Sequence, residues 1–255
     1  MSKIAAANPQ SQPDSAEVTA ALLVIADEIL SGRTKDKNIG FIADHCTLIG
    51  IRLKEVRIVG DSEGAIVEAL NDLRPKYTYV FTTGGIGPTH DDITADAIAR
   101  AFGVSINVDP RAVAMLLERY TEKDLTPARL RMARIPSGAS LVANSVSKAP
   151  GFMIENVIVM AGVPQIMQAM TLEVTPRLRS GAKMLSETVR VDAPEGEIAG
   201  PLGESQAAFP QVAMGSYPFF ENGSYGSNLV LRSTDAELLT RAKADLLHRL
   251  SHLIC

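Results

Sequence analysis

From Thr19 onward, short β-rich runs alternate with longer stretches whose apolar residues recur every three or four positions. The runs at residues 20–26, 52–59 and 78–83 read as strands, and glycine, proline or polar residues mark where each one ends. Alternation of strand and helix patterns is typical of βαβ units that build a mostly parallel sheet. The first part of the chain is therefore predicted to be an α/β domain.

The stretches between these strands predict helices, because their apolar positions fall on one helical face and capping residues bound them. Further along, the pattern predicts strands crossed by turns and then one more helix. The predicted helices cover residues 37–49, 62–73, 93–103, 110–120, 126–134 and 164–173, and the strands crossed by turns cover residues 140–164.

A second unit is predicted after a linker marked by Pro176 and Gly181. Its strand at 188–192, helix at 198–208, strands at 211–219 and 228–233 and helix at 235–253 make a β-α-β-β-α pattern, enough for a small α+β domain. Residues 1–17 are rich in Ser, Ala, Gln and Pro and have no apolar core of a signal peptide. The predicted division is a disordered tail at 1–17, an α/β domain at 18–175 and a small α+β domain at 176–255.

Composition and net charge limit the kind of molecule that the protein is expected to bind. Hydrophobic residues make up 46% and charged residues 21%, the usage of an ordinary globular protein. The net charge of -4 gives no basic footprint for nucleic acid, and the GxxG at 200–203, which resembles that of RNA-binding KH domains, contains no basic residue. We therefore expect a small-molecule partner and no nucleic acid.

Apolar runs and cysteines bear on location. The strongest apolar run ends at Asp27 and Glu28, well short of the roughly 20 residues of a membrane span, so no membrane is expected. Cys46 and Cys255 are the two cysteines, too few for a disulfide framework or a cysteine metal site. Reduced thiols and a cytoplasmic location are the expectation.

Carboxylates follow all three predicted parallel strands: Asp27 and Glu28 the first, Asp61 the second, and Asp91 and Asp92 the third. Because ligands bind beyond the carboxyl ends of such strands, these side chains are expected at one edge of the sheet. Carboxylate oxygens suit Mg²⁺, which is held by one or two carboxylates together with substrate phosphate. The pattern predicts a divalent metal site at Asp27, Glu28, Asp61 and Asp92. The competing interpretation makes each carboxylate a helix cap or a loop charge.

A glycine-rich turn follows the third strand, where Thr83 precedes Gly84, Gly85 and Gly87. Backbone amides at such a turn, close to a helix start, can hold an anion. The turn is not a Walker A loop, because no Gly-Lys-Ser/Thr follows, and taken alone a tight structural turn explains it nearly as well. Together with the carboxylates behind it, it indicates a phosphate site.

Residues 82–94, Thr-Thr-Gly-Gly-Ile-Gly-Pro-Thr-His-Asp-Asp-Ile-Thr, closely resemble the signature of molybdopterin-binding domains of the MoaB/MogA type, in the branch called CinA. Residues 27–33 with Asn38, residues 59–62 and residues 144–152 fit the same family in the same order. The resemblance spans about residues 18–175.

The resemblance implies a three-layer α/β/α domain that binds a molybdopterin or a nucleotide phosphate with Mg²⁺ or another divalent metal. It makes Asp61 and Asp92 the catalytic candidates and implies a homo-oligomer, a dimer or a trimer. Family members with deamidase activity carry a further C-terminal domain, which we expect to be missing here. The ligand-binding residues are then Thr83, Gly84, Gly85, Gly87, Asn38, Asn144 and Lys148, the last able to reach a phosphate as a point charge.

Three functions follow, and the sequence leaves open whether the protein is an enzyme. The first is binding of a molybdopterin-like or nucleotide phosphate ligand with a metal. The second is a metal-dependent pyrophosphatase that acts on dinucleotides of the ADP-ribose or FAD type. The third is a non-catalytic pterin carrier or regulatory module, which departures from the family pattern at Lys37, Ile86 and Asp91 favour.

Overall fold

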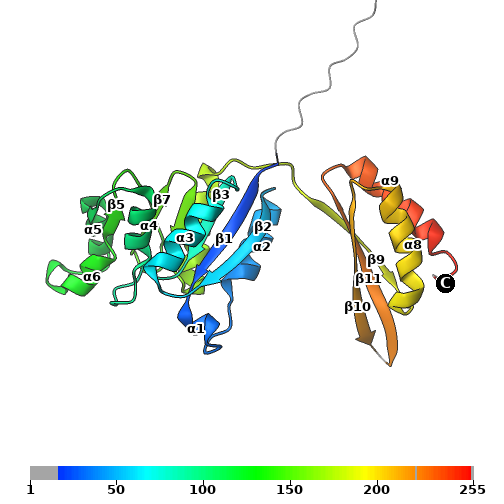
Figure 1. The fold of residues 1–255 in the computed structure, drawn as a ribbon, viewed down its shortest axis with the longest axis horizontal. Coiled ribbons are helices and arrows are strands. Elements are labelled where there is room, and N and C mark those ends of the chain that lie inside the picture. Colours follow the sequence, from blue (N-terminus) through cyan, green and yellow to red (C-terminus); the bar gives the residue numbers. More distant parts are fainter. Residues whose placement is uncertain (1–16, 222, 254–255) are drawn as a thin grey trace, which may run out of the picture. The chain divides into compact units, whose positions relative to one another are not determined.

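A computed structural model describes residues 17–221 and 223–253, and it divides the chain into two compact units (Figure 1). The first unit ends at Gly181 and the second begins at Ala182. Except for Glu17, the predicted tail at 1–17 lies outside the described residues. Glu17 is exposed and pairs with Arg52 at 2.8 Å and with Lys54 at 3.0 Å.

A six-stranded sheet, ordered β2-β1-β3-β8-β7-β6, forms the centre of the first unit. The four strands from β2 to β8 run parallel, and β7 and β6 pair antiparallel to their neighbours. The mostly parallel sheet is therefore confirmed. The strands are β1 (Thr19–Ile25), β2 (Arg52–Val59), β3 (Tyr79–Thr83), β6 (Ser140–Val142), β7 (Gly151–Ile154) and β8 (Val157–Met160).

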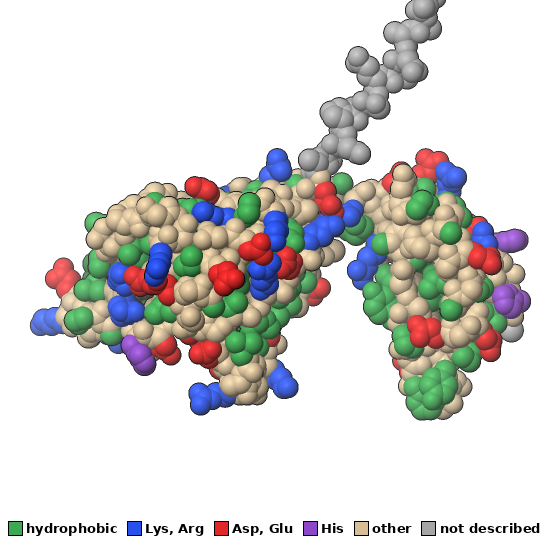
Figure 2. All heavy atoms as spheres, viewed as in Figure 1, with side chains coloured by type: hydrophobic (Ala, Val, Ile, Leu, Met, Phe, Trp, Pro, Cys, Tyr) green, Lys and Arg blue, Asp and Glu red, His purple; other side chains and the backbone are tan. Residues whose placement is uncertain are grey.

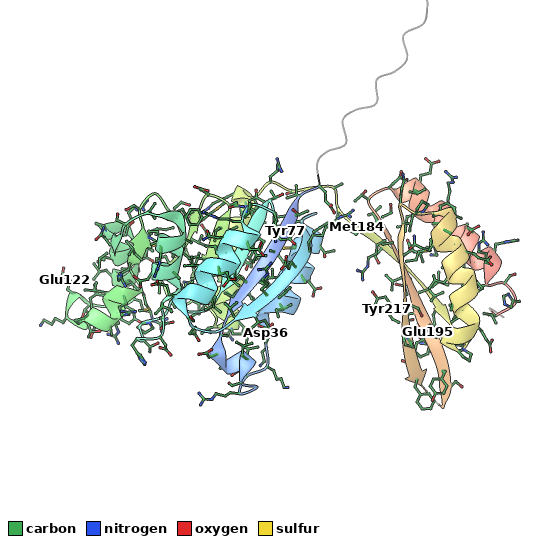
Figure 3. The ribbon with its side chains drawn as sticks, viewed as in Figure 1. Asp36, Tyr77, Glu122, Met184, Glu195 and Tyr217 are labelled. Carbon is green, nitrogen blue, oxygen red and sulfur yellow. The ribbon has the colours of Figure 1, made fainter. Side chains whose placement is uncertain are left out.

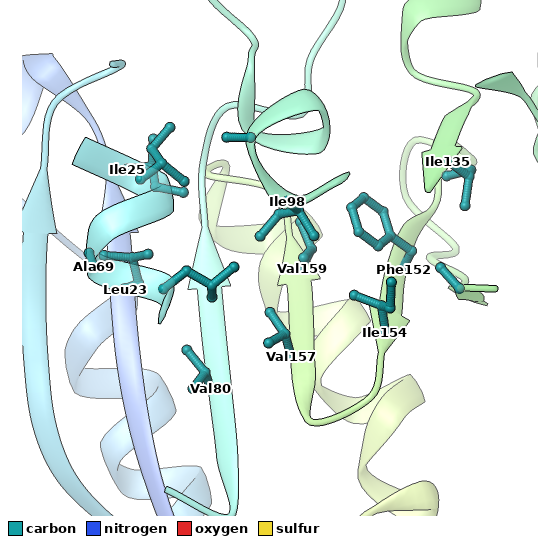
Figure 4. Close-up of a cluster of buried hydrophobic side chains, with 14 of the residues drawn as sticks. Leu23, Ile25, Ala69, Val80, Ile98, Ile135, Phe152, Ile154, Val157 and Val159 are labelled. Atoms are coloured by element: carbon teal, nitrogen blue, oxygen red, sulfur yellow. The ribbon is translucent and has the colours of Figure 1, made fainter. Parts of the chain in front are cut away.

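Helices cover both faces of this sheet, because β1 is apolar on both. Ala21, Leu23 and Ile25 belong to one core, and the alternate residues of β1 belong to the other. The first core takes in α3 (Glu63–Leu73), α4 (Thr94–Phe102) and α5 (Pro110–Leu117); the second takes in α2 (Asn38–Leu48) and α7 (Pro164–Val174). Figure 4 shows the first core, with sheet residues facing Ala69 and Ile98 from the helices. The result is the predicted three-layer α/β/α arrangement.

Local signals set several helix ends. Proline is the first residue of α5, of α6 (Pro127–Arg131) and of α7, where its missing N–H has no helical acceptor to lose. Gly103 ends α4 in the left-handed conformation, at φ 65°. The short helix α1 (Asp27–Leu30) was not predicted, since four residues are too few to show a helical period.

The predicted helix at 126–134 is too long. It ends at Arg131, and a strand, β5 (Arg134–Pro136), follows and pairs with β4 (Ile106–Val108) in a two-stranded sheet. In the sequence, the helical spacing of apolar residues continues past Arg131 without a break. Pairing with β4, which is distant along the chain, gives residues 134–136 their strand conformation.

Residues 176–181 belong to the first unit, six residues beyond the predicted boundary. Leu178 is buried in the core of α2 and α7, and the Arg179 N–H donates to the hydroxyl of Tyr79 at 2.7 Å. The Gly181 N–H donates to the carbonyl of Gly50 at 3.2 Å. These contacts hold residues 176–181 against the first unit, although Pro176 and Gly181 predicted a linker there.

The second unit has an antiparallel sheet of order β10-β11-β9 with two helices packed on one face. Val189, Val191, Leu229 and Leu231 contact Ile198 and Leu246 in its core. The hairpin is longer than predicted, because pairing with β10 extends β11 back to Ser224, through polar residues and Gly226. The elements are β9 (Leu185–Val191), α8 (Glu195–Ala208), β10 (Ala213–Glu221), β11 (Ser224–Ser233) and α9 (Ala236–Arg249).

Surface chemistry follows the composition. Acidic and basic side chains are mixed on the face of the first unit seen in Figure 2. Apolar side chains gather at the tip of the β10–β11 hairpin, where Phe220 and Tyr225 are exposed and their ring centroids lie 4.8 Å apart. None of the helices in residues 17–221 and 223–253 has the length and apolar character to cross a membrane.

Candidate functional site

A cavity of about 520 Å³ lies where β1 and β3 end, and residues 24–26 and Thr83 form part of its wall. The glycine-rich turn, the starts of α2 and α7 and the segment around Ser147 complete it. In Figure 3, Asp36, just before α2, lies at this edge of the sheet, and Tyr77, just before β3, lies at the opposite one. Ligands of parallel α/β sheets bind at the edge where the strands end.

The glycine-rich turn has a backbone that side chains would not tolerate. Gly84 and Gly85 have φ 103° and 67°, and a Cβ on Gly84 would lie 2.2 Å from the carbonyl oxygen of Ile25. A Cβ on Gly85 would lie 2.1 Å from Oγ1 of Thr94. The buried Thr94 fixes the turn, because its hydroxyl donates to the Gly84 carbonyl at 3.0 Å and its N–H donates to the Gly85 carbonyl at 3.0 Å.

Three successive backbone donors of this turn are free for a ligand. The N–H of Gly84 donates to the carbonyl of Met160, but within the described residues the N–H groups of Gly85, Ile86 and Gly87 have no acceptor. All three residues line the cavity. Consecutive unpaired N–H groups beside a helix start are a binding site for an anion such as phosphate.

Asp61 lies at the acidic side of the cavity. Its Oδ2 accepts from the Asp27 N–H at 3.1 Å, which links the loops after β1 and β2. Burial raises the pKa of the Asp61 carboxyl, and the backbone donor at Asp27 opposes that rise. The negative charges of Asp27, Glu28 and Asp91 raise the pKa further. The carboxylates of Asp27, Glu28 and Asp91 thus add to the negative potential at Asp61.

Asp92 also lines the cavity, but it shapes the loop as well. Its Oδ2 accepts from the Thr89 N–H at 2.8 Å and from the Thr89 hydroxyl. A Cβ on Gly87 would lie 2.6 Å from the same oxygen, so Gly87 makes room for this carboxylate. Among the described residues, Oδ1 of Asp92 has no donor and is the oxygen available to a ligand.

The four predicted metal ligands do not form a ready metal cage. In the described part of the chain no three His, Cys, Asp or Glu side chains are grouped closely enough to hold a metal ion. Asp61, Glu28 and Asp92 line the cavity, whereas Asp27 does not. A Mg²⁺ ion in this cavity would therefore take one or two of these carboxylates and complete its shell with water and ligand phosphate.

Asn38 and Thr83, two of the residues predicted to bind the ligand, line the cavity, and both are buried. Nδ2 of Asn38 donates to the carbonyl of Gly162 at 2.8 Å, which ties the start of α2 to the turn before α7. Oδ1 of Asn38 and Oγ1 of Thr83 have no partner among the described residues. Both atoms are shielded from solvent, and unpaired buried polar atoms of this kind are costly in a folded protein.

Asn144 and Lys148, also predicted to bind the ligand, do not line the cavity. Oδ1 of Asn144 accepts from the N–H groups of Val146 and Ser147, and its Nδ2 donates to the carbonyl of Ala149. Lys148 has φ 65° and pairs with Glu118 at 2.7 Å. Both residues order a turn that brings Ser147 and Ala149 to the cavity, so their contribution in this structure is indirect.

Apolar side chains of the wall were not predicted as site residues. Ile29, Ile86, Met132, Ile166 and Met170 all line the cavity. The sequence pattern alone does not separate these residues from core residues, because apolar side chains on helices and in loops commonly pack into the core. Their place in the chain could have indicated a role in the site, because each lies within one or two helical turns of a predicted strand end or helix start.

The first unit matches the family model described as "Probable molybdopterin binding domain" over residues 21–180, and the second matches "FAD synthase, middle domain" over residues 183–255. A protein of Pyrobaculum arsenaticum is 34% identical over 77% of this chain and 78% of its own. A "CinA-like protein" of Citrifermentans bemidjiense is 34% identical over 91% of this chain, which spans 58% of that relative.

A solved structure titled as the protein CinA with unknown function, from Thermoplasma acidophilum, is 33% identical with a TM-score of 0.60. It covers 62% of this chain and 96% of its own. The matched family model, which spans well over half of the chain, and these relatives agree with the resemblance in residues 82–94. The chain therefore belongs to the family of probable molybdopterin binding domains, with CinA-like proteins among its relatives.

Proposed function

We propose that the first unit binds a phosphorylated pterin or nucleotide at the edge where β1 and β3 end, together with a divalent cation such as Mg²⁺. The observation that carries this proposal is the run of unpaired N–H groups at Gly85, Ile86 and Gly87, held open by the backbone of Gly84 and by Thr94. A phosphate accepting from these groups satisfies donors that have no acceptor among the described residues.

The carboxylates have the remaining roles in the proposed site. Asp61, Glu28 and Asp91 all line the cavity and would provide the negative charge that holds the cation. Asp92 lines the same cavity from the glycine-rich turn. A bound divalent ion would supply charge neutralisation on phosphate oxygens. Asp61 orients the loop after β1 through the Asp27 N–H, and Thr89 holds Asp92. The backbone donors and these side chains together position a phosphate or pyrophosphate group.

A second candidate function is metal-dependent hydrolysis of a dinucleotide pyrophosphate of the ADP-ribose or FAD type. It is supported by the match of residues 183–255 to the middle domain of FAD synthase, which suggests a nucleotide ligand for this chain. The same donors and carboxylates serve either function, because both kinds of ligand present phosphate oxygens. Turnover in the absence of a pterin separates pyrophosphatase from carrier.

The test combines ligand binding with product analysis on the full chain. Thermal stabilisation and mass spectrometry are measured with ADP-ribose, FAD, AMP and a pterin phosphate, each with and without Mg²⁺, Mn²⁺ or Co²⁺. We expect at least one phosphorylated ligand to raise Tm, and we expect Asp61→Asn to lose the part of that rise that depends on metal.

Asp44→Asn is the matched control, because Asp44 is an exposed carboxylate of α2 outside the cavity wall. Its response to ligand and metal should equal that of the wild type. Hydrolysis that disappears in Asp61→Asn would identify the pyrophosphatase, and stabilisation without product would identify the carrier. No stabilisation by any of the ligands would contradict the proposal.

A further inference from the structure

Strand β2 lies at the edge of the six-stranded sheet, and within the described residues its one strand neighbour is β1 (Figure 1). On its other side, no strand of residues 17–221 and 223–253 pairs with its outward N–H and C=O groups. Two large apolar side chains of this strand are exposed, Val56 to 38% and Ile58 to 37%. An uncovered edge strand with exposed apolar side chains is a template for pairing with another strand.

The part of β2 that follows Lys54 is regular. The register between β1 and β2 shifts at Lys54, which has no partner in β1, and the pairing then continues without interruption over residues 55–59. Side chains of a strand alternate between the two faces of its sheet, so Glu55 and Arg57 share one face and Val56 points to the other. A regular segment of this kind offers an unbroken ladder to a second strand.

The charges of this segment make the strand complementary to itself. When two copies of β2 pair antiparallel about a two-fold axis at Val56, Glu55 of each copy lies directly opposite Arg57 of the other. Registers centred on Glu55 or on Arg57 instead place two like charges opposite each other. Of these three registers, the one centred on Val56 is therefore favoured by charge, because opposite charges across a ladder stabilise it and like charges weaken it.

The two charged side chains are ordered by contacts within the chain. Arg57 pairs with Glu55 at 2.5 Å and with Asp72 of α3, and the hydroxyl of Tyr77 donates to Glu55 at 2.7 Å. Arg57 is still 30% exposed and Glu55 29% exposed, so each can take a further partner. Side chains that are already ordered lose less rotamer freedom when they pair across an interface.

The opposite face of the same segment is apolar at its centre. In the register centred on Val56, the two copies of this valine face each other, and Ile58 of each copy lies opposite Lys54 of the other. Lys54 can cover the isoleucine with its aliphatic stem, because its ammonium group pairs with Glu17 at 3.0 Å. Pairing in this register therefore buries the exposed apolar side chains of β2 without leaving a charge unpaired.

We propose that the uncovered edge of β2 is a homodimer interface, in which β2 of a second copy pairs antiparallel about Val56 and joins the two six-stranded sheets into one. A two-fold contact of this kind closes with two copies. Of the dimer and the trimer that the sequence left open, the charges of β2 select the dimer. The proposal does not depend on which ligand the cavity binds.

The oligomeric state of the full chain tests the interface. Size-exclusion chromatography with light scattering, over a range of concentrations, should show a dimer for the wild type. Val56→Lys places two like charges at the two-fold axis and should raise the dissociation constant of the dimer at least about tenfold. Val108→Lys is the matched control, because Val108 is an exposed strand valine outside β2, and it should remain dimeric.

Glu55→Arg and Arg57→Glu test the register. Each variant alone sets like charges opposite each other and should be monomeric where the wild type is dimeric. In a mixture of the two, every cross-strand pair at these positions joins opposite charges again, so a heterodimer should form. Co-elution with an affinity-tagged variant detects it, and circular dichroism checks that each variant is folded. If either variant does not fold, the wild type and Val56→Lys decide the proposal.

The contrary outcomes are separate from those of the ligand site. A wild type that is a monomer or a trimer overturns the proposal, and so does a dimer that Val56→Lys leaves unchanged. Two folded charge variants that form no heterodimer overturn the register centred on Val56. Binding of a phosphorylated ligand by a monomeric wild type would leave the proposed function in place while removing this interface.

Discussion

Gly84 is the residue on which the shape of the phosphate site depends. Its φ of 103° lies in a region that glycine adopts without strain and that side chains rarely adopt. The space beside it is closed as well, because the carbonyl oxygen of Ile25 lies 2.2 Å from where a Cβ would stand. The three nearest atoms all belong to the backbone of Ile25, so no flexible side chain can move away.

Gly84→Ala is expected to destabilise the first unit by about 3 kcal/mol, from positive φ together with the backbone clash. It should also abolish stabilisation by phosphorylated ligands, since the N–H groups of residues 85–87 would be displaced. Urea unfolding and ligand-dependent Tm measure the two effects. Gly64→Ala in α3, where a Cβ meets nothing within 4 Å, should instead be neutral or stabilise by up to about 1 kcal/mol. Equal stability of the two variants would contradict the role of Gly84.

Asp61 makes stability depend on pH. Because its pKa is raised in the folded chain, the native state binds the proton more tightly than the unfolded state does. Stability contributed by the neutral carboxyl is present below pH 3.8, the ordinary pKa of an aspartate, and is lost as the pH rises through the raised pKa of the folded state. At neutral pH the folded state therefore carries an unfavourable charge.

Asp61→Asn should consequently be more stable than the wild type at pH 7, by about 0.5 kcal/mol after allowance for solvent screening, or about 1–2 °C in Tm. The difference should vanish near pH 3, where both side chains are neutral. Thermal unfolding between pH 3 and 8 measures it. A wild type that is the more stable of the two at pH 7 without metal would show that the negative charges around Asp61 are compensated.

Helix α4 couples the core to the site. Its first residue, Thr94, is fully buried and bonds through Oγ1 and N–H to the carbonyls of Gly84 and Gly85. Ala97 and Ile98 of the same helix pack on the sheet. The glycine-rich turn is thus positioned by an element whose own place is set by apolar burial.

Thr94→Val keeps the volume but leaves the Gly84 carbonyl without its side-chain donor, and we expect a loss of about 1–2 kcal/mol in the free energy of unfolding. The affinity for phosphorylated ligands should fall about tenfold as the turn loosens. Thr94→Ser retains the hydroxyl and should recover most of the affinity. Denaturant unfolding and calorimetry measure both properties, and an affinity of Thr94→Val equal to that of the wild type would show that the turn holds its shape without this bond.

At the scale of the whole molecule, the chain has two separately cored units. The first unit has an apolar core on each face of its sheet, and the second has a core of its own built around Leu229, Leu231 and Leu246. The proposed ligand site lies entirely within the first unit. The predicted dimer or trimer and the cytoplasmic location stay predictions.

Leu231→Ala should therefore destabilise the second unit by about 2–5 kcal/mol, since Leu231 is fully buried there. Ligand-induced stabilisation of the first unit should be unchanged. Scanning calorimetry of the full chain should show one transition shifted downwards and another, the one that responds to ligand, at its original temperature. Loss of the ligand response in this variant would mean that the second unit supports the site.

The sequence predicted most of the fold because its signals are local. Strand β2 was predicted with its observed bounds, and β1, β3 and the starts of α3, α5 and α7 to within one residue, because period, proline and capping residues lie next to one another in the chain. Strand β5, the early start of β11 and the segment after Pro176 were not, since each is held by partners far along the chain: β4, β10 and Tyr79.

The candidate site likewise has features that the sequence predicted and features that it did not. The sequence by itself determined that Thr83, the glycines and the carboxylates after the strands meet at one edge, because parallel strands bring their carboxyl ends together. Only the tertiary structure decided that Asn144 and Lys148 order a turn outside the cavity wall, and that Asn38 is pinned to Gly162. The direction of a side chain depends on which distant group satisfies its hydrogen bonds, and local patterns do not record that group.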